Sequence, residues 1–314
     1  MEVRRSTAFA PAAISNFFTI HDEGASEGDY ESFANVGATG GGFVLSKGVY
    51  TEARYVNGRS PIKVNVTVNA NPNYEAKTTR MAVRILLERA KLTGGSLRLS
   101  QRVEIPIGYG FGASAASALS AVIATASAAD LHLSSREVAL AAHVADILSR
   151  TGLGTVSAIF RTAGAGAITR PGAPGIAEFL RVRVPRGMKL VTASLAPYEK
   201  AGVLASAEMK KKVNRLGREA LERVVQNPTF EELARSGGWF ALRLGLETGE
   251  LRKLIEIAKR GGALWASQNM IGYSIHCIVE EGHVSKVANS LSKSSLKPDV
   301  RTFDFGRERS RLLD

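Results

Sequence analysis

Pro106-Ile-Gly-Tyr-Gly-Phe-Gly-Ala-Ser-Ala-Ala116 is a glycine-rich segment that runs directly into a stretch of small residues. An alternating apolar segment before it, 96–107, predicts a strand, and residues 114–129 predict a buried helix. A strand, a glycine loop and a helix start in this order present free backbone N–H groups and the positive end of a helix dipole to an anion. The segment therefore predicts a phosphate-binding loop in a protein that uses a nucleotide.

Two other phosphate-binding motifs fit this segment less well. The ATPase-type loop needs a lysine after its last glycine, and none occurs here. The dinucleotide motif needs a different glycine spacing, although Asp130 stands at an acceptable distance for its acidic residue. The hydroxyl of Ser114 can bind Mg²⁺ or phosphate, and it can also cap the helix. The residues expected at the nucleotide phosphates are Gly108, Gly110, Phe111, Gly112, Ala113, Ser114 and Ala115.

Length and composition indicate a globular enzyme. With 314 residues, 45% hydrophobic and 22% charged, the chain favours two lobes, which we place at 1–175 and 176–314 on either side of a Pro/Gly break. The single cysteine, Cys277, lies in an apolar run and predicts a core residue in a reducing, cytoplasmic protein. We find no signal peptide and no apolar run long enough to span a bilayer.

The net charge of +12 raises the question of a nucleic-acid partner. The basic residues are scattered, and the tight cluster at 210–212 is most simply the solvated face of a helix. No zinc-finger spacing or aromatic–basic stripe accompanies them, so we expect no nucleic-acid partner. The excess of positive charge suits an enzyme with two anionic substrates, and a basic nucleic-acid binder is the outlying alternative.

The rest of the chain predicts an α+β fold without regular strand–helix alternation. A capping-box pattern at Ser134 opens one helix, which extends to about Ser149. The remaining expected helices lie at 74–92, within 205–260 and at 284–291. The expected strands lie at 49–55, 64–68, 179–184, 188–194, 274–279 and 299–305, with a tight turn at 37–42.

The glycine segment resembles the P-x-x-x-G-L-G-S-S-A motif of the GHMP kinases, a superfamily that includes galactokinase, homoserine kinase and mevalonate kinase. Within it the chain is most similar to archaeal pantoate kinases, through segments 10–18, 37–45 and 151–155. The resemblance implies a ribosomal-S5-like N-terminal lobe, an α/β C-terminal lobe and an active site in the cleft. It also implies ATP and Mg²⁺, a small hydroxy-acid substrate such as pantoate, a role in coenzyme A synthesis, and a possible homodimer.

Four positions depart from the pantoate kinase pattern. This chain has Ala13 for histidine, Thr39 for arginine, Asp146 for glutamate and Thr155 for aspartate. The first two positions are expected near the acceptor and the last two near the metal or the transferred proton. The departures leave open another acceptor, such as mevalonate, a mevalonate phosphate or homoserine, and also a non-catalytic nucleotide-binding homologue.

Ser114 and Asp146 are the expected Mg²⁺ ligands, and Thr155 occupies the position of the family's catalytic acid. Asp146 alternatively forms a surface ion pair with Arg150, four residues further along the helix. A threonine cannot accept a proton at neutral pH, which leaves three hypotheses. Phosphoryl transfer proceeds without a base, another acid such as Asp22 takes the proton, or the protein has lost or changed its activity. We favour transfer without a base, because a loose transition state demands little deprotonation.

The acceptor pocket is expected to include polar side chains of the first segment and a second glycine-rich turn, whose backbone N–H groups form a nest that could bind a carboxylate. Its candidate residues are Ser15, Asn16, Gly40, Gly41 and Arg150, with Gly42 completing the turn and Arg161 as an alternative cation. A plain hairpin turn is the alternative for the glycines. His143 is expected in the core. The other histidines show no metal-ligand spacing, so no zinc site is expected.

Overall fold

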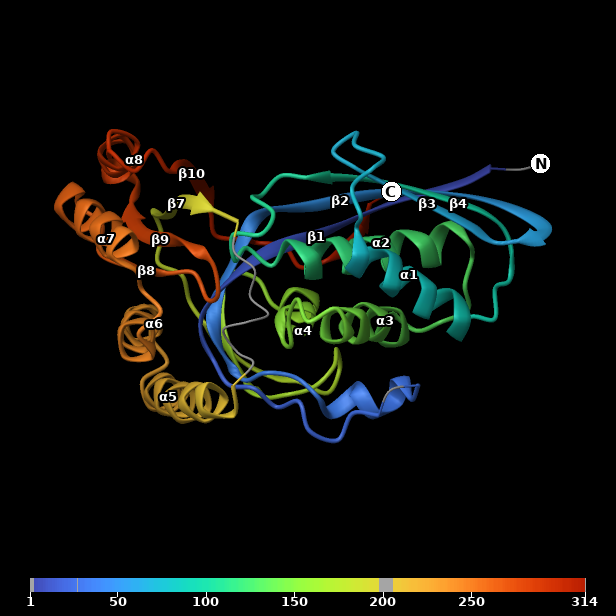
Figure 1. Cartoon of the computed structure of the whole chain (residues 1–314), viewed down its shortest axis with the longest axis horizontal. Helices are drawn as coiled ribbons and strands as arrows, with labels where there is room; N and C mark the ends of the chain where they lie inside the picture. The colour runs from blue at the N-terminus through green and yellow to red at the C-terminus, as the bar shows by residue number, and fades with distance from the viewer. Residues whose placement is uncertain (1–2, 27, 198–205, 314) are drawn as a thin grey trace.

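The computed structural model describes residues 3–26, 28–197 and 206–313 and has an α+β fold with two sheets. The first sheet has the strand order β11-β1-β2-β4-β3, and β5 pairs with β2 and with β6. Its long strands β1 and β2 pair antiparallel and extend across the molecule (Figure 1). The strands are β1 (Val3–Phe18), β2 (Gly40–Pro61), β3 (Lys63–Val68), β4 (Gly94–Val103), β5 (Ala165–Arg170), β6 (Glu178–Val182) and β11 (Arg311–Leu313).

Four helices pack together beneath the long strands (Figure 1). The central one, α2, contacts both β1 and β2 and is buried over most of its length. Alanine and serine allow it to approach the sheet closely, because small side chains leave little between backbone and strand. These helices are α1 (Lys77–Arg89), α2 (Ala113–Ala128), α3 (Ser135–Leu148) and α4 (Thr155–Arg161), and the short 3₁₀ helix η1 (Tyr30–Asn35) lies near α3.

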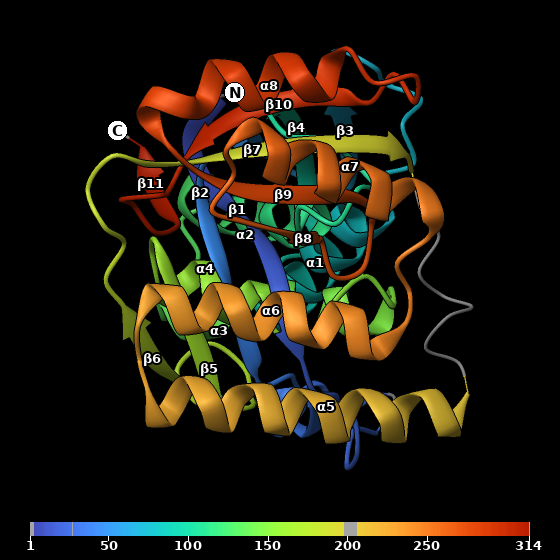
Figure 2. The same cartoon turned by 90° about the vertical axis from the view of Figure 1, so that its left-hand side faces the viewer.

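The second sheet has the order β10-β7-β9-β8 and forms the other part of the molecule with four more helices (Figure 2). Its strands are β7 (Met188–Ala196), β8 (Trp265–Gln268), β9 (Tyr273–Glu280) and β10 (Asp299–Asp304). Its helices are α5 (Ala207–Gln226), α6 (Phe230–Leu244), α7 (Gly249–Gly261) and α8 (Val284–Ser292). One continuous cluster of buried side chains joins both sheets, so the two parts share a core.

Helices α5 and α6 pack closely on the end of β1 because each presents a glycine there. A Cβ on Gly217 would lie 2.1 Å from the carbonyl oxygen of Phe18, and one on Gly237 would lie 2.7 Å from the Cβ of Asn16. Larger side chains at either position would push the helices away from the strand. The two glycines therefore fix the distance between the C-terminal helices and the end of β1, which also borders the cavity described below.

The predicted elements are largely present. The capping box at the start of α3 is confirmed, since Ser134 and Glu137 make both of its reciprocal hydrogen bonds. The helices expected at 74–92 and 114–129 are α1 and α2, with ends shifted by a few residues. No helix within the described residues is long and apolar enough to cross a membrane.

One prediction about the first sheet needs correction. The tight turn expected at 37–42 is wrong, because Gly40 opens β2 and pairs with both Phe18 of β1 and Ile168 of β5. Strand β6 pairs with β5 of the first sheet and β7 belongs to the second, so the chain passes from one sheet to the other between Val182 and Met188. Strand β11, close to the C-terminal residue, also pairs with β1.

Candidate active site

The glycine segment forms a loop between β4 and α2 whose backbone requires glycine. Gly108, Gly110 and Gly112 have φ angles of 90°, 84° and 65°, in the left-handed region that residues with a Cβ rarely adopt. Gly112 is the N-cap of α2, and no side chain caps this helix. Ser114 is consequently the second residue of the helix and not its cap, which removes one explanation for its hydroxyl. The uncapped N-terminus fits an anion.

The loop is fixed from both sides. The hydroxyl of Ser274 in β9 donates to the Tyr109 carbonyl oxygen at 2.5 Å, and the side-chain amide of Asn269 donates to the same oxygen at 3.5 Å. On the other side, the backbone N–H of Ala13 donates to the Phe111 carbonyl oxygen at 3.1 Å. These bonds attach the loop to β1 and to the second sheet.

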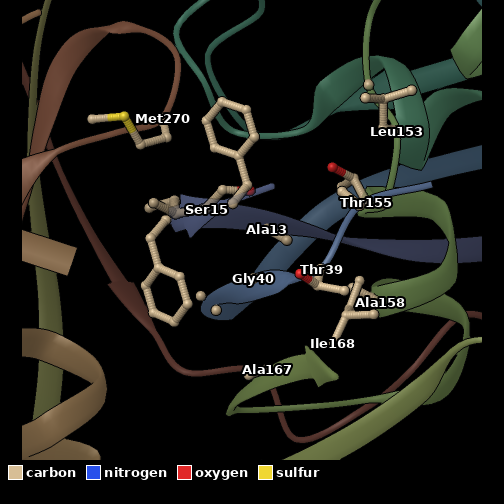
Figure 3. A pocket seen from close by; sticks show the side chains of 18 of the residues that line it. Ala13, Ser15, Thr39, Gly40, Leu153, Thr155, Ala158, Ala167, Ile168 and Met270 are labelled. Atoms are coloured by element: carbon tan, nitrogen blue, oxygen red, sulfur yellow. The ribbon is translucent and has the colours of Figure 1, made fainter. Parts of the chain in front are cut away.

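A cavity of about 590 Å³ lies beside this loop, between the ends of β1 and β2. Figure 3 shows Ala13, Ser15, Thr39, Gly40 and Thr155 around it. The loop and the cavity wall meet at Thr155, the first residue of α4. A Cβ on Gly112 would lie only 2.8 Å from the Thr155 Cγ2 atom. A phosphate at the head of α2 and a molecule in the cavity would therefore be neighbours.

Ser15, Gly40, Gly41 and Arg150 line the cavity, whereas Asn16 does not. Asn16 is fully buried and its amide nitrogen donates to the Leu233 carbonyl oxygen of α6 at 3.3 Å, so its assignment to the acceptor pocket is corrected. The side chain of Asn16 instead packs against Gly237 of α6, which covers it.

The expected nest of free N–H groups at the second glycine segment is also wrong. Gly40, Gly41 and Gly42 pair with β1 on one side and with β5 on the other, so this backbone serves the sheet. Glycine is needed for close packing instead: a Cβ on Gly42 would lie 2.1 Å from the Ile14 carbonyl oxygen. These residues can shape the cavity but cannot form the predicted carboxylate nest.

Asp146 is a buried carboxylate and not the surface acid considered from the sequence. It is 2% exposed, and the Thr151 hydroxyl donates to its Oδ1 atom at 2.6 Å. Gly152 lies directly against the carboxylate, because a Cβ there would be 2.3 Å from Oδ2. Thr151 and Gly152 line the cavity, so Asp146 stands directly behind this wall.

The structure adds cavity residues that the sequence did not reveal. Lys210 of α5, assigned above to a solvated face, lines the cavity and forms an ion pair with Asp22. Met270 also lines it, and its backbone N–H donates to the Ser15 carbonyl oxygen at 3.0 Å. Arg161 is exposed and is not among the lining residues, which leaves Arg150 as the better placed of the two arginines.

His143 and Cys277 lie in the core, as expected from the sequence, and His276 is buried as well. His143 is 1% exposed and bonds through Nε2 to the Val36 carbonyl oxygen at 2.9 Å, and burial lowers its pKa to about 4. His276 is buried beside Asn269, and burial lowers its pKa to about 3. Burial raises the pKa of the Cys277 thiol. Among the described residues, no group of three or more His, Cys, Asp or Glu side chains could hold a metal ion.

The loop, the uncapped helix and the adjoining cavity define the class of protein. A phosphate donor at the head of α2 would meet an acceptor held between β1, β2 and α4, which is the arrangement of a small-molecule phosphotransferase. Residues 77–162 match the model of the GHMP kinases N terminal domain.

Two relatives and one solved structure match this chain over nearly its whole length. A pantoate kinase of Methanospirillum hungatei is 28% identical over 99% of this chain and 100% of its own length. A pantoate kinase of Thermococcus kodakarensis is 29% identical over 93% of this chain and 94% of its own. A structure described as a phosphotransferase related to the CoA biosynthesis pathway has a TM-score of 0.84 at 25% identity, covering 98% of each chain. The chain is thus similar to the GHMP kinases over residues 77–162 and to pantoate kinases over nearly its whole length.

The fold extends to more distant relatives. A homoserine kinase of Cytophaga hutchinsonii has a TM-score of 0.69 at 13% identity, covering 98% of this chain and 97% of its own. At this identity the likeness concerns the fold alone. The two-lobe α+β architecture expected from the sequence is thus confirmed.

Proposed function

We propose that this protein is a kinase that transfers the γ-phosphate of ATP to a hydroxyl of pantoate and forms 4-phosphopantoate for coenzyme A synthesis. The observation that carries the proposal is the contact between the glycine loop and the cavity wall at Gly112 and Thr155. It would bring a phosphate at the head of α2 next to an acceptor in the cavity. The similarity to pantoate kinases over nearly the whole chain supports the choice of acceptor.

The cavity suits a small anionic hydroxy acid. Two cationic side chains, Arg150 and Lys210, line it, and the hydroxyls of Ser15 and Thr39 are also in its wall. Arg150 offers a planar guanidinium that can pair with a carboxylate through two hydrogen bonds. Lys210 already has Asp22 as a partner, so Arg150 is the stronger candidate for the acceptor's carboxylate.

The protein's contribution to the reaction is positioning and charge stabilisation. The amides at the head of α2 would hold the β- and γ-phosphates, and the cavity would direct the acceptor hydroxyl toward the γ-phosphorus. Thr155, at the junction, cannot remove the hydroxyl proton, and Asp22 is engaged by Lys210. A loose transition state requires little deprotonation before transfer, so we infer a reaction without a protein base.

Mg²⁺ fits this site in part. Ser114 would supply a hydroxyl from the first turn of α2, and Asp146 would supply a carboxylate from behind Thr151. Because Mg²⁺ usually keeps several waters and binds substrate phosphates, two protein oxygens are enough. The ion would neutralise phosphate charge. The buried free thiol of Cys277 supports a reducing, cytoplasmic setting.

An ADP-release assay with a panel of acceptors tests the proposal. Pantoate should be turned over, whereas mevalonate, mevalonate phosphate and homoserine should not. Turnover of mevalonate phosphate without turnover of pantoate would reject the assignment.

Thr155 motivates a second candidate, a non-catalytic nucleotide-binding homologue. Calorimetry would support it by detecting Mg-ATP binding in a protein that transfers phosphate to none of these acceptors.

A further inference from the structure

Three side chains form a hydrogen-bonded row from the surface to the cavity wall. The exposed His21 lies 2.8 Å through Nε2 from the Thr19 Oγ1 atom, and that atom lies 2.5 Å from Thr39 Oγ1. Thr19 and Thr39 are 1% and 6% exposed, and only Thr39 lines the cavity. The three residues therefore connect solvent with the acceptor pocket.

The backbone holds this row in register. The Thr19 N–H donates to the Thr39 carbonyl oxygen at 2.8 Å, and His21 and Gly37 exchange two backbone hydrogen bonds. Asn214 of α5 bonds to both the N–H and the carbonyl of Ile20, at 2.6 and 3.0 Å. The backbone of residues 19–21 is thus fixed on both sides, so the hydroxyl oxygens of Thr19 and Thr39 are held close together.

The Thr19 hydroxyl can accept two hydrogen bonds and donate one, and the groups that donate to it determine the direction of its own proton. The Thr39 backbone N–H donates to this oxygen at 3.2 Å and occupies one lone pair. If the His21 Nε2–H occupies the other, the Thr19 proton must point to Thr39 Oγ1. The Thr39 proton is then directed away from Thr19 and is available to a molecule in the cavity.

We propose that Thr39 is a specificity-determining residue that donates a hydrogen bond to an oxygen of the acceptor, and that His21 and Thr19 are positioning residues that hold its hydroxyl as a donor. The inference rests on the proposed function, since it names a contact to the hydroxy acid of that reaction. It assigns the Nε2–H tautomer to the neutral His21 ring.

The surroundings of His21 favour that neutral ring. Partial burial lowers its pKa first, the positive charge of Arg218 lowers it further, and Lys210 adds to the same effect. Asp22 and Glu23 oppose the shift without reversing it. At neutral pH the ring therefore carries one proton, and the row depends on which nitrogen holds it.

Variants of the three residues in the row test the proposal, because they should change the KM for the hydroxy acid and not the KM for ATP. Thr39→Val should raise the KM for the hydroxy acid roughly tenfold and leave the KM for ATP unchanged, as expected for one lost hydrogen bond to a charged oxygen. Thr19→Val and His21→Ala should each raise the acceptor KM about threefold. The effect is smaller than that of Thr39→Val because the Thr39 hydroxyl remains and only its orientation is less well fixed. Thr19→Ser, which keeps the hydroxyl, should behave as the unaltered protein.

The matched control is Thr125→Val, because Thr125 is a buried threonine of α2 whose hydroxyl has no hydrogen-bond partner. It should change neither KM. The double variant Thr19→Val/His21→Ala should be no worse than either single variant, since both break the same row. Additive losses, or a Thr19→Ser variant as impaired as Thr19→Val, would overturn the proposal.

Nitrogen-15 NMR of the labelled histidines, with His21→Ala for assignment, gives a result that is independent of turnover. The expected spectrum at pH 7.5 shows His21 with its proton on Nε2. If Nε2 of His21 carries no proton, the proposed roles of His21 and Thr19 are wrong, even if the kinase is active. If no hydroxy acid is phosphorylated, the proposed function fails, and the NMR result still decides whether His21 donates to Thr19.

Discussion

Replacing Gly112 by alanine should damage both the stability of the protein and its use of ATP. At φ 65° an alanine costs about 1–2 kcal/mol through contact of its Cβ with its own backbone. The new Cβ would also lie 2.8 Å from Thr155 Cγ2 and 3.2 Å from the Ala13 carbonyl oxygen. Relief of this overlap would move the loop that carries the phosphate-binding amides. Each lost hydrogen bond to a phosphate costs about 1.5–3 kcal/mol, so kcat/KM for ATP should fall roughly tenfold to a hundredfold.

Urea unfolding and steady-state kinetics measure the two effects. Combining Gly112→Ala with Thr155→Ser removes the Cγ2 atom and should recover the part of the loss that comes from the overlap. Gly238→Ala is the matched control, because a Cβ there meets nothing within 4 Å. The reasoning fails if Gly112→Ala leaves both the unfolding free energy and the ATP kinetics unchanged, or if the double variant recovers nothing.

Four further predictions concern other residues of the site and core. Thr155→Ala should lower kcat only slightly in the ADP-release assay, and a fall of several orders of magnitude would show that Thr155 takes part in the chemistry. Asp146→Asn should raise the Mg²⁺ concentration needed for half-maximal rate; an unchanged Mg²⁺ titration would reduce Asp146 to a structural role. Arg150→Ala should raise the KM for the hydroxy acid roughly tenfold and leave that for ATP unchanged, and an equal effect on both would argue against pairing with the acceptor. His143 has a pKa lowered from 6.5 to about 4, so the unfolded chain binds the proton more readily between these values. The unfolding free energy should therefore decrease as the pH falls through that window, by up to about 1.4 kcal/mol per pH unit from this group. His143→Gln should flatten the dependence measured by urea titration at several pH values, and an identical slope would contradict the assignment.

The sequence was most informative where local chemistry determines local structure. The glycines at 108, 110 and 112 predicted a loop, and all three adopt the left-handed conformation. Ser134 and Glu137 predicted a capping box that is present. These features depend on neighbours within a few residues, so they can be predicted without knowledge of the tertiary structure.

Features that depend on distant strands could not be predicted in this way. Gly40–Gly42 resembled a turn because glycine is common in turns, yet close packing against β1 requires glycine there. Asn16 looked available to a substrate, but α6 covers it from more than 200 residues further along the chain. Lys210 belongs to a basic cluster whose pattern does not reveal that one member turns toward the cavity.

The pairing of β11 with β1 has a consequence for biosynthesis. Residues 311–313 complete the edge beside Thr7, Ala8 and Phe9. While the chain grows on the ribosome, this edge of β1 has unpaired backbone hydrogen-bonding groups until about three hundred further residues have been made. An open strand edge invites pairing with other chains. We therefore expect the Thr7–Phe9 stretch of the nascent protein to be open to pairing with other chains until β11 has been made.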